Sequence, residues 1–280
     1  MKVTKNPDGK SLTIERDGKS FDYFFVWLRD HCRCPDCYNQ VTSQRKINVT
    51  DIPADITARN CQVEGEDLKI VWHDGHKSVY SVSFLENVSY ENYLKRLQRN
   101  YILWTKDEIL DSPVSHVSFE DLLGTEEGVL KTVKSLVDYG IAFVENVPAD
   151  IKATEEAVVK LSHVQHTLFG GMWEFSDSMD HQDTAYTTGE LGLHTDNTYF
   201  TEAAGLQVLH CLNHTGTGGM NMLVDGFKAA EILRASNADA FSRLATTCLE
   251  AEYLEPGYHH TYTAPVIKLH PVTKQLEQIR

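Results

Sequence analysis

Cysteine spacing near the N-terminus indicates a metal site. Cys32, Cys34 and Cys37 lie within a single six-residue segment. Thiolates bind Zn²⁺ well, and a structural zinc site takes four nitrogen or sulfur ligands in a tetrahedron, so one more ligand must come from elsewhere in the chain. We predict that His76, which follows a predicted turn, supplies it and that the site binds zinc. Three other residues compete for this fourth position: His31, His73 and Cys61.

A second pattern, His194-Thr195-Asp196, could bind iron. Residues two apart on a strand point to the same face, so this His and Asp could both contact one metal ion. Two His and one carboxylate form the facial triad of non-haem Fe(II) oxygenases, which leaves positions open for a cosubstrate and oxygen. The same spacing recurs at His181 and Asp183, so the motif indicates iron only together with its surroundings.

Two β-hairpins are expected to position the cysteines. One spans residues 11–31 with a turn at Asp17-Gly18, and the other pairs LKIVW with SVYSVSF across Asp74-Gly75. We therefore predict a small β-rich domain over residues 1–95, which contains the cysteine cluster. The polar stretch over residues 96–115 is predicted to be a connection.

The remaining residues, 116–280, form the second predicted domain, which begins with helices. One helix is predicted over residues 126–138, ending before Gly140, and the run IAFVENV that follows is typical of a buried strand. Thr154 is a plausible N-cap of a further helix. The apolar face of the first helix comprises Val129, Val133, Leu136 and Val137.

Short strand-like runs follow residue 183, among them GLQVLHCL, MNMLVDG and APVIKLH, with one helix near residues 227–245. The final run, VTKQLEQIR, is also predicted to be a strand, and His259 and His260 are expected in a loop. Helices followed by many short strands predict an α+β layout with a sandwich or barrel.

Composition excludes several classes of function. The 41% hydrophobic and 24% charged content is that of a soluble globular protein, and no apolar run is long enough to span a membrane. A net charge of −14 argues against nucleic acid as a partner. The clustered cysteines, with no signal peptide before them, favour a reducing compartment. The first residues lack a transit-peptide pattern, which predicts the cytosol if Met1 is the true start.

The order of motifs around His194 resembles that of a known enzyme superfamily. The segment contains, in order, H-T-D, an aromatic segment, a strand, T-G-G, a strand and D-G-F. This order resembles that of the taurine-dioxygenase-like 2-oxoglutarate oxygenases. Four segments are similar to the γ-butyrobetaine and trimethyllysine dioxygenase family: VWLRDHCRCPDCYN, TAYTTGELGLHTD, GLQVLHCL and TGGMNMLVDGF. Two more are similar to the trimethyllysine branch of that family: YGIAFVENVP and LFGGMWEFSDS. The resemblance implies an α+β chain, with a small zinc-bearing β-rich N-terminal domain before an incomplete double-stranded β-helix (jelly-roll) oxygenase domain.

The resemblance also implies an activity and its cofactors. The family's enzymes use Fe(II), 2-oxoglutarate and ascorbate, and the trimethyllysine branch hydroxylates N6,N6,N6-trimethyllysine at C3, the first step of carnitine biosynthesis in the mitochondrial matrix. The implied partner is therefore a small molecule, and a homodimer is compatible with the family. By this resemblance His194 and Asp196 correspond to iron ligands, while Asn221 stands where relatives place a Thr or Ser that touches 2-oxoglutarate. The residues corresponding to the family's zinc site are Cys32, Cys34, Cys37 and His76.

Four further residues correspond to the substrate site. Phe169, Trp173 and Tyr186 match the family's aromatic cage, which suits a trimethylammonium group because that group has no N–H to donate and is held by cation–π attraction. Asp183 stands where the butyrobetaine enzymes have Asn. A carboxylate there would pair with the α-ammonium of trimethyllysine, so it favours that substrate.

Two of the family's functional residues have no counterpart in these 280 residues. The third iron ligand, a His in an N-W-R-x-L-H-G segment, and the Arg that clamps 2-oxoglutarate are both absent. We therefore expect residues 1–280 alone to hydroxylate nothing, and expect Val266, Ile267 and Leu269 to be exposed. Two alternatives remain: γ-butyrobetaine hydroxylation, or a non-catalytic zinc-bearing fragment that acts as a binding or dimerisation module.

Overall fold

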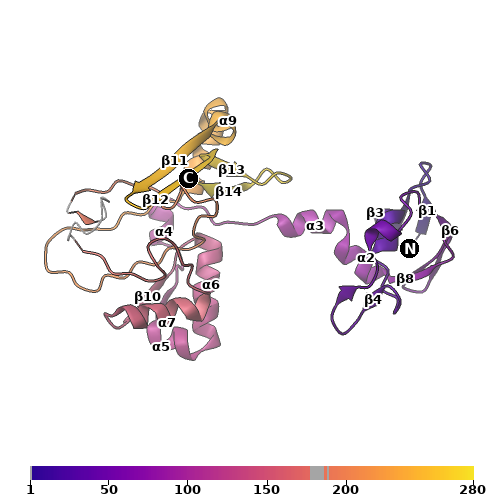
Figure 1. Ribbon diagram of the computed structural model, residues 1–280, viewed down its shortest axis with the longest axis horizontal. Helices are drawn as coiled ribbons and strands as arrows, with labels where there is room; N and C mark the ends of the chain where they lie inside the picture. Colours follow the sequence, from indigo (N-terminus) through magenta and orange to yellow (C-terminus); the bar gives the residue numbers. More distant parts are fainter. Residues whose placement is uncertain (1, 177–185, 188) are drawn as a thin grey trace. The chain divides into compact units, whose positions relative to one another are not determined.

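A computed structural model describes residues 2–176, 186–187 and 189–280. The chain forms two compact units, Met1–Arg99 and Asn100–Arg280, and both mix helices with strands, as predicted (Figure 1). Over the described residues, no helix is long and apolar enough to cross a membrane.

The first unit is built on two three-stranded antiparallel sheets, with strand orders β1-β2-β3 and β6-β7-β8 (Figure 1). The two predicted hairpins are confirmed as β2–β3 and β7–β8, and each gains a third strand that the sequence did not predict. A short antiparallel pair, β4–β5, follows the cysteines. The strands are β1 Lys2–Lys5, β2 Ser11–Arg16, β3 Lys19–Phe24, β4 Tyr38–Asn39, β5 Gln44–Arg45, β6 Ala58–Glu64, β7 Asp67–Trp72 and β8 Lys77–Ser81.

Both hairpins lead directly into helices, where the sequence had predicted continued strand. Helix α1 spans Phe25–Asp30 and helix α2 spans Val82–Val88. In α1 the buried residues Phe25 and Leu28 are three apart, which is helical spacing, while Phe24 is 60% exposed. The aromatic richness of this segment favours a strand locally, but burial of one helical face decides its structure.

One hydrophobic core joins both sheets to α1. Its largest buried side chains include Phe25, Trp72 and Tyr80, and the rings of Phe25 and Trp72 meet edge to face at 6.0 Å. The buried Tyr80 hydroxyl donates to the carbonyl of Leu28 in α1. This contact fixes the helix that precedes the cysteines against the sheet that carries His76.

Two helices reach into the stretch over residues 96–115 that the sequence predicted to be a connection. Helix α3 spans Tyr90–Leu97 and begins at Ser89, whose hydroxyl accepts the backbone N–H of Asn92. Helix α4 spans Lys106–Leu110 and starts with a capping box. A 3₁₀ turn, η1, covers Val49–Asp51.

The second unit opens with a helical layer (Figure 1). Its helices are α5 Phe119–Gly124, α6 Glu126–Tyr139 and α7 Ile151–Leu161, and its first strands are β9 His116–Ser118 and β10 Phe143–Glu145. The predicted helix over residues 126–138 is confirmed, and Gly140 ends it in a left-handed conformation with φ of 76°. The predicted strand after it is short, pairs in parallel with β9, and has an exposed Phe143.

The buried face of α6 differs in part from the predicted apolar one, although Val129 does pack against the core of Val117, Leu122 and Ala157. Gly128, Thr132 and Ser135 are the buried residues, whereas Val137 is 63% exposed. Helix α6 crosses α5 so closely that a Cβ on Gly128 would lie 2.3 Å from a backbone oxygen of α5. Close helix contact therefore selects small residues on this face, and Val133 and Val137 are exposed.

The prediction of Thr154 as an N-cap is wrong. Helix α7 begins at Asp150, whose carboxylate accepts the N–H of Ala153 at 2.9 Å. Thr154 lies inside the helix, where its hydroxyl donates back to the carbonyl of Asp150 at 2.9 Å. Asp150, four residues before Thr154, reaches the free N–H groups, so it takes the capping role.

The predicted helix near residues 227–245 is two helices, α8 Gly226–Ser236 and α9 Ala238–Thr246. Asn237 separates them and caps the second, since its side chain accepts the N–H of Ala240 at 3.0 Å. Two antiparallel pairs follow: β11 Cys248–Glu255 with β12 Tyr258–Pro265, and β13 Ile267–Leu269 with β14 Leu276–Ile279.

These last strands correct two predictions. His259 and His260 lie on β12, where they pair with β11, and not in a loop. Ile267 is only 2% exposed, because β13 pairs with β14 and packs against Phe241 of α9, so the predicted exposure of this apolar strand is wrong. The final strand prediction is confirmed as β14.

Two predicted strands are absent from the described part of the second unit. GLQVLHCL and MNMLVDG are irregular, and Leu206, Val208 and Leu209 are exposed. A strand forms only where a neighbour pairs with its backbone N–H and C=O groups, and no such neighbour lies beside these runs within the ranges that the structure covers.

Candidate metal centres

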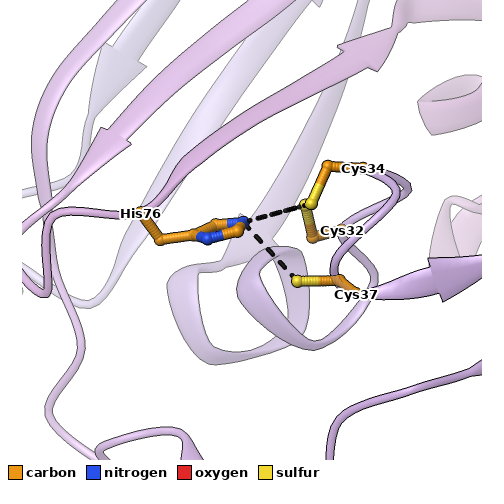
Figure 2. Close-up of side chains that lie close together, drawn as sticks. All are labelled: Cys32, Cys34, Cys37 and His76. Atoms are coloured by element: carbon orange, nitrogen blue, oxygen red, sulfur yellow. Dashed lines mark hydrogen bonds between the residues drawn. The ribbon is translucent and has the colours of Figure 1, made fainter.

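The four predicted zinc ligands lie together in the first unit (Figure 2). The sulfur atoms of Cys32, Cys34 and Cys37 lie 3.3, 3.6 and 3.5 Å from Nε2 of His76. All four candidate ligand atoms lie within 4.8 Å of one another. Ideal tetrahedral bonds of about 2.3 Å to sulfur and 2.0–2.1 Å to nitrogen would separate sulfur from nitrogen by about 3.6 Å. The cluster therefore fits a tetrahedral S₃N metal site.

Two structural segments bring these ligands together. The cysteines follow the end of α1, where a tight turn forms as the N–H of Cys37 donates to the carbonyl of Cys34 at 3.1 Å. His76 follows the turn between β7 and β8, with Gly75 at a φ of 87°. The sheet and α1 share one core, so the two segments meet across it.

The other three candidates for the fourth ligand lie elsewhere. The His31 ring stacks on Trp27 at 4.0 Å, and its Nδ1 lies 2.8 Å from the carbonyl of Trp27. His73 is exposed, and Cys61 lies in β6 outside the cluster. Among the competing residues, only His76 is near the three sulfur atoms.

The surroundings of the cluster suit the protonation changes that metal binding requires. Burial, together with the nearby Arg29 charge, lowers the pKa of His76, which favours the neutral imidazole that binds metals. Burial raises the pKa of Cys37. Burial acts in the same direction on Cys34, but hydrogen bonds from the Cys37 backbone and the neighbouring thiols outweigh it and lower the pKa of Cys34. Metal binding here would therefore release protons from thiols.

The second predicted pair, His194 and Asp196, also comes together. Nε2 of His194 lies 3.2 Å from Oδ1 of Asp196, and both side chains are nearly half exposed. Nδ1 of His194 lies 2.6 Å from the carbonyl of Gly192, and Gln207 donates to Oδ2 of Asp196 at 2.5 Å. One atom of each residue is thus held by a neighbour, while the other can face a metal.

The prediction that His194 and Asp196 lie on a strand is wrong. The segment is irregular, with Asn197 at a φ of 58°. Local hydrogen bonds, and not the alternation of side chains along a strand, hold the two side chains near each other. The Arg280 guanidinium donates to the carbonyl of Thr198, which ties this loop to the end of β14.

No further candidate ligand joins His194 and Asp196 in the part of the chain that the structure describes. Two residues form only an incomplete facial triad. Three later histidines have other neighbours: His210 with Thr154 at 2.7 Å, His259 with Glu252 at 2.8 Å, and His260 with Phe200 at a ring distance of 5.4 Å.

The structure brings together two of the three predicted cage aromatics. The rings of Phe169 and Trp173 stack at 5.6 Å, whereas Tyr186 is buried against Phe175 at 5.9 Å. Tyr253 of β11 meets Phe169 edge to face at 5.5 Å. Tyr253 also lies 5.0 Å from Tyr199, which belongs to the loop that follows Asp196.

Comparison with known proteins decides the family. A family model described as "Taurine catabolism dioxygenase TauD, TfdA family" matches residues 107–280, which is more than half of the chain. The chain belongs to this family. A second model, "Gamma-butyrobetaine hydroxylase-like, N-terminal", matches residues 3–86, the region with the Cys₃His cluster. The predicted resemblance is therefore confirmed.

Curated relatives of this TauD, TfdA family chain are similar over nearly its whole length. "Trimethyllysine dioxygenase, mitochondrial" of Bos taurus is 39% identical over 280 residues, covering 99% of this chain and 66% of the relative. The Homo sapiens protein of the same name is 39% identical over 264 residues, covering 93% and 62%. "Dioxygenase str8" of Strobilurus tenacellus is 34% identical over 258 residues, covering 88% and 60%. The chain thus spans less than two thirds of the length of these relatives.

Of the remaining predicted site residues of this TauD, TfdA family chain, the structure describes Asn221 but not Asp183. Asp183 lies outside the described residues, as does His181. Asn221 is exposed in the irregular segment before α8. Tyr199 and Tyr253 lie near the cage aromatics, and the sequence motifs do not predict this. Tyr199 belongs to the aromatic run after the H-T-D motif, and that run could have indicated it. The contact of Tyr253 with Phe169 could not be predicted, because it requires the β11–β12 hairpin.

Proposed function

We propose that this chain carries the metal centres and part of the substrate site of an Fe(II)- and 2-oxoglutarate-dependent trimethyllysine dioxygenase. The observation that carries the proposal is the His194–Asp196 pair, with ligand atoms 3.2 Å apart, inside the unit matched by the TauD, TfdA family model. The names and 39% identity of the mammalian relatives support trimethyllysine as the substrate and the mitochondrion as the compartment.

In this proposal the two units have separate roles. Residues 1–95 hold a structural zinc, residues 96–115 connect, and residues 116–280 contribute to a double-stranded β-helix. When bound, Fe(II) supplies the activation of oxygen with 2-oxoglutarate, and ascorbate keeps the iron reduced. His194 and Asp196 hold the metal, with Gln207 and the carbonyl of Gly192 orienting them.

The aromatic side chains take the cationic end of the substrate. Phe169 and Trp173 are already in contact, and the half-exposed Trp173 leaves a ring surface open to a ligand. The trimethylammonium group would be held by these rings and by Tyr186 through cation–π attraction, with Asp183 at the α-ammonium and Asn221 near 2-oxoglutarate.

The activity test compares two proteins. One is residues 1–280, and the other is an extended chain, in which residues 1–280 are followed by the part of the Bos taurus relative that lies beyond the matched region. Each is incubated with Fe(II), ascorbate, 2-oxoglutarate and trimethyllysine, and succinate and hydroxytrimethyllysine are measured by mass spectrometry. We expect turnover from the extended chain and none from residues 1–280. An extended chain that folds but makes no hydroxytrimethyllysine would contradict the proposal.

A second candidate substrate is γ-butyrobetaine, favoured by the description of the family model that matches residues 3–86. In the extended chain we expect Asp183→Asn to lower kcat/KM for trimethyllysine about 10- to 100-fold, since a hydrogen bond to a charged group contributes about 1.5–3 kcal/mol. Use of γ-butyrobetaine, which has no α-ammonium, should change much less and serves as the internal control. Equal losses on both substrates would show that Asp183 does not bind the α-ammonium.

The aromatic cage gives a separate prediction. In the extended chain, Trp173→Ala and Tyr186→Ala should each raise KM for trimethyllysine about 2- to 30-fold, which corresponds to about 0.5–2 kcal/mol of cation–π attraction. KM for 2-oxoglutarate should stay nearly unchanged because the cage contacts only the cation. Tyr93→Ala is the matched control, since Tyr93 and Trp173 are both 46% exposed. Equal effects on both KM values would indicate a role in packing instead.

A further inference from the structure

The Arg29 side chain lies between the two segments that carry the Cys₃His cluster. Its Nη1 donates to the sulfur of Cys37 at 3.4 Å, and its Nε lies 3.2 Å from Oδ2 of Asp74. The Arg29 side chain is only 12% exposed, so solvent competes weakly for these contacts. Arg29 sits in the last turn of α1, immediately before the cysteines.

Asp74 makes the matching contact on the other segment. Its Oδ1 accepts the backbone N–H of His76 at 2.9 Å, which fixes the turn that presents the imidazole. Its second oxygen faces Arg29. A continuous series of contacts therefore runs from one ligand to the other, from Cys37 through Arg29 and Asp74 to His76.

The charges in this series are also complementary. Three thiolates around Zn²⁺ carry a net charge of about −1, from −3 and +2, and the imidazole adds none. Cys32 and Cys37 are buried, so this charge is poorly solvated. The Arg29 guanidinium lies beside the cluster and donates an N–H from Nη1 to the sulfur of Cys37. Its Nε forms an ion pair with the carboxylate of Asp74.

We propose that Arg29 and Asp74 are positioning residues of the metal centre. They hold α1 and the β7–β8 turn at the separation that the four ligands need, and Arg29 stabilises the Cys37 thiolate. This inference rests on the proposed zinc site, but it assigns a role to two residues that bind no metal themselves. Hydrogen-bonded partners of metal ligands typically change metal affinity about 10- to 100-fold.

The experiment measures zinc affinity of residues 1–280 by competition with a chelating dye at fixed pH. We expect Arg29→Gln to weaken zinc binding about 10- to 100-fold and Asp74→Asn to weaken it in the same direction. The zinc affinity of Arg29→Lys should lie between those of the unmodified chain and Arg29→Gln, because an ammonium keeps the charge but lacks the planar fork that reaches both partners. The Arg29→Gln, Asp74→Asn double variant should lose less than the product of the two single losses, because the residues act through each other.

A spectroscopic measurement separates positioning from general destabilisation. With Co²⁺ in place of zinc, the thiolate-to-cobalt charge-transfer band should shift in Arg29→Gln, since the hydrogen bond to Cys37 is lost. Arg16→Gln is the matched control: Arg16 also pairs with carboxylates in the same unit, the closest being Glu66 at 2.8 Å, but it lies outside the cluster. It should leave both affinity and spectrum unchanged.

The outcomes distinguish the two levels of the inference. If the unmodified chain binds no zinc, the proposed site fails and the positioning role fails with it. If the unmodified chain binds zinc and Cys34→Ser does not, the site stands, and unchanged affinity and spectrum in Arg29→Gln would overturn the positioning role alone. Should Arg29→Gln fold poorly, Asp74→Asn gives the same decision, since it keeps the shape of the side chain.

Discussion

Cys37→Ser is expected to remove nearly all zinc from the chain. A serine hydroxyl is a poor zinc ligand compared with a thiolate, and the remaining three ligands leave the tetrahedron open. Loss of hydrogen-bonded partners alone costs about 10- to 100-fold in affinity, so loss of a direct ligand should cost more. Cys34→Ser is expected to act in the same way. Metal analysis of purified protein should find one zinc per unmodified chain and almost none in either variant.

Stability should follow the metal. Zinc binds the folded arrangement of ligands and not the unfolded chain, so its binding free energy adds to folding free energy. Cys37→Ser should therefore lower the unfolding temperature of the first unit, and a chelator should lower that of the unmodified chain. Cys61→Ser is the control, because Cys61 lies in the same unit outside the cluster. Full zinc content in both Cys34→Ser and Cys37→Ser would contradict the assignment.

His194→Ala is expected to abolish turnover in the extended chain. The variant removes one of the two described residues whose atoms converge for iron, and Asp196→Ala removes the other. We expect kcat to fall by more than about 100-fold in each, because outer partners of metal ligands alone account for up to that amount. Fe(II) titration should show weakened binding in parallel, which separates loss of the metal from loss of the substrate site.

His163→Ala is the matched control for these variants. His163 is an exposed histidine of the same unit, outside any cluster of candidate ligands among the described residues, and its replacement should leave turnover and Fe(II) binding unchanged. Near-normal turnover in His194→Ala would overturn its role as a ligand. Multiple turnovers by residues 1–280 alone would indicate that a later histidine substitutes for the third ligand, with His259, His260 and His270 the residues to test.

The family of the chain could be predicted from the sequence, and so could the grouping of the Cys₃His cluster and of the His194–Asp196 pair. Metal-ligand spacing is local, so Cys32, Cys34 and Cys37 indicate a site before any fold is known. Turn signals such as Asp17-Gly18 and stop signals such as Gly140 also act within a few residues, and the structure has a hairpin and a helix end there.

Contacts between distant segments decided the fourth ligand of the cysteine cluster, the structure of α1, the buried face of α6 and the neighbours of Arg29 and Tyr253. The sequence left four candidates for the fourth ligand of the cysteine cluster, and the shared core of α1 and the β7–β8 sheet brings His76 to the cysteines. Burial against that core also turns Phe25–Asp30 into a helix although its residues favour a strand locally. Close packing against α5 buries the Gly128 face of α6 and leaves Val133 and Val137 exposed. Likewise, Arg29 and Tyr253 gain their neighbours only when turns and hairpins far along the chain meet them, because hydrogen bonds and ring contacts depend on distance in space and not on spacing in sequence.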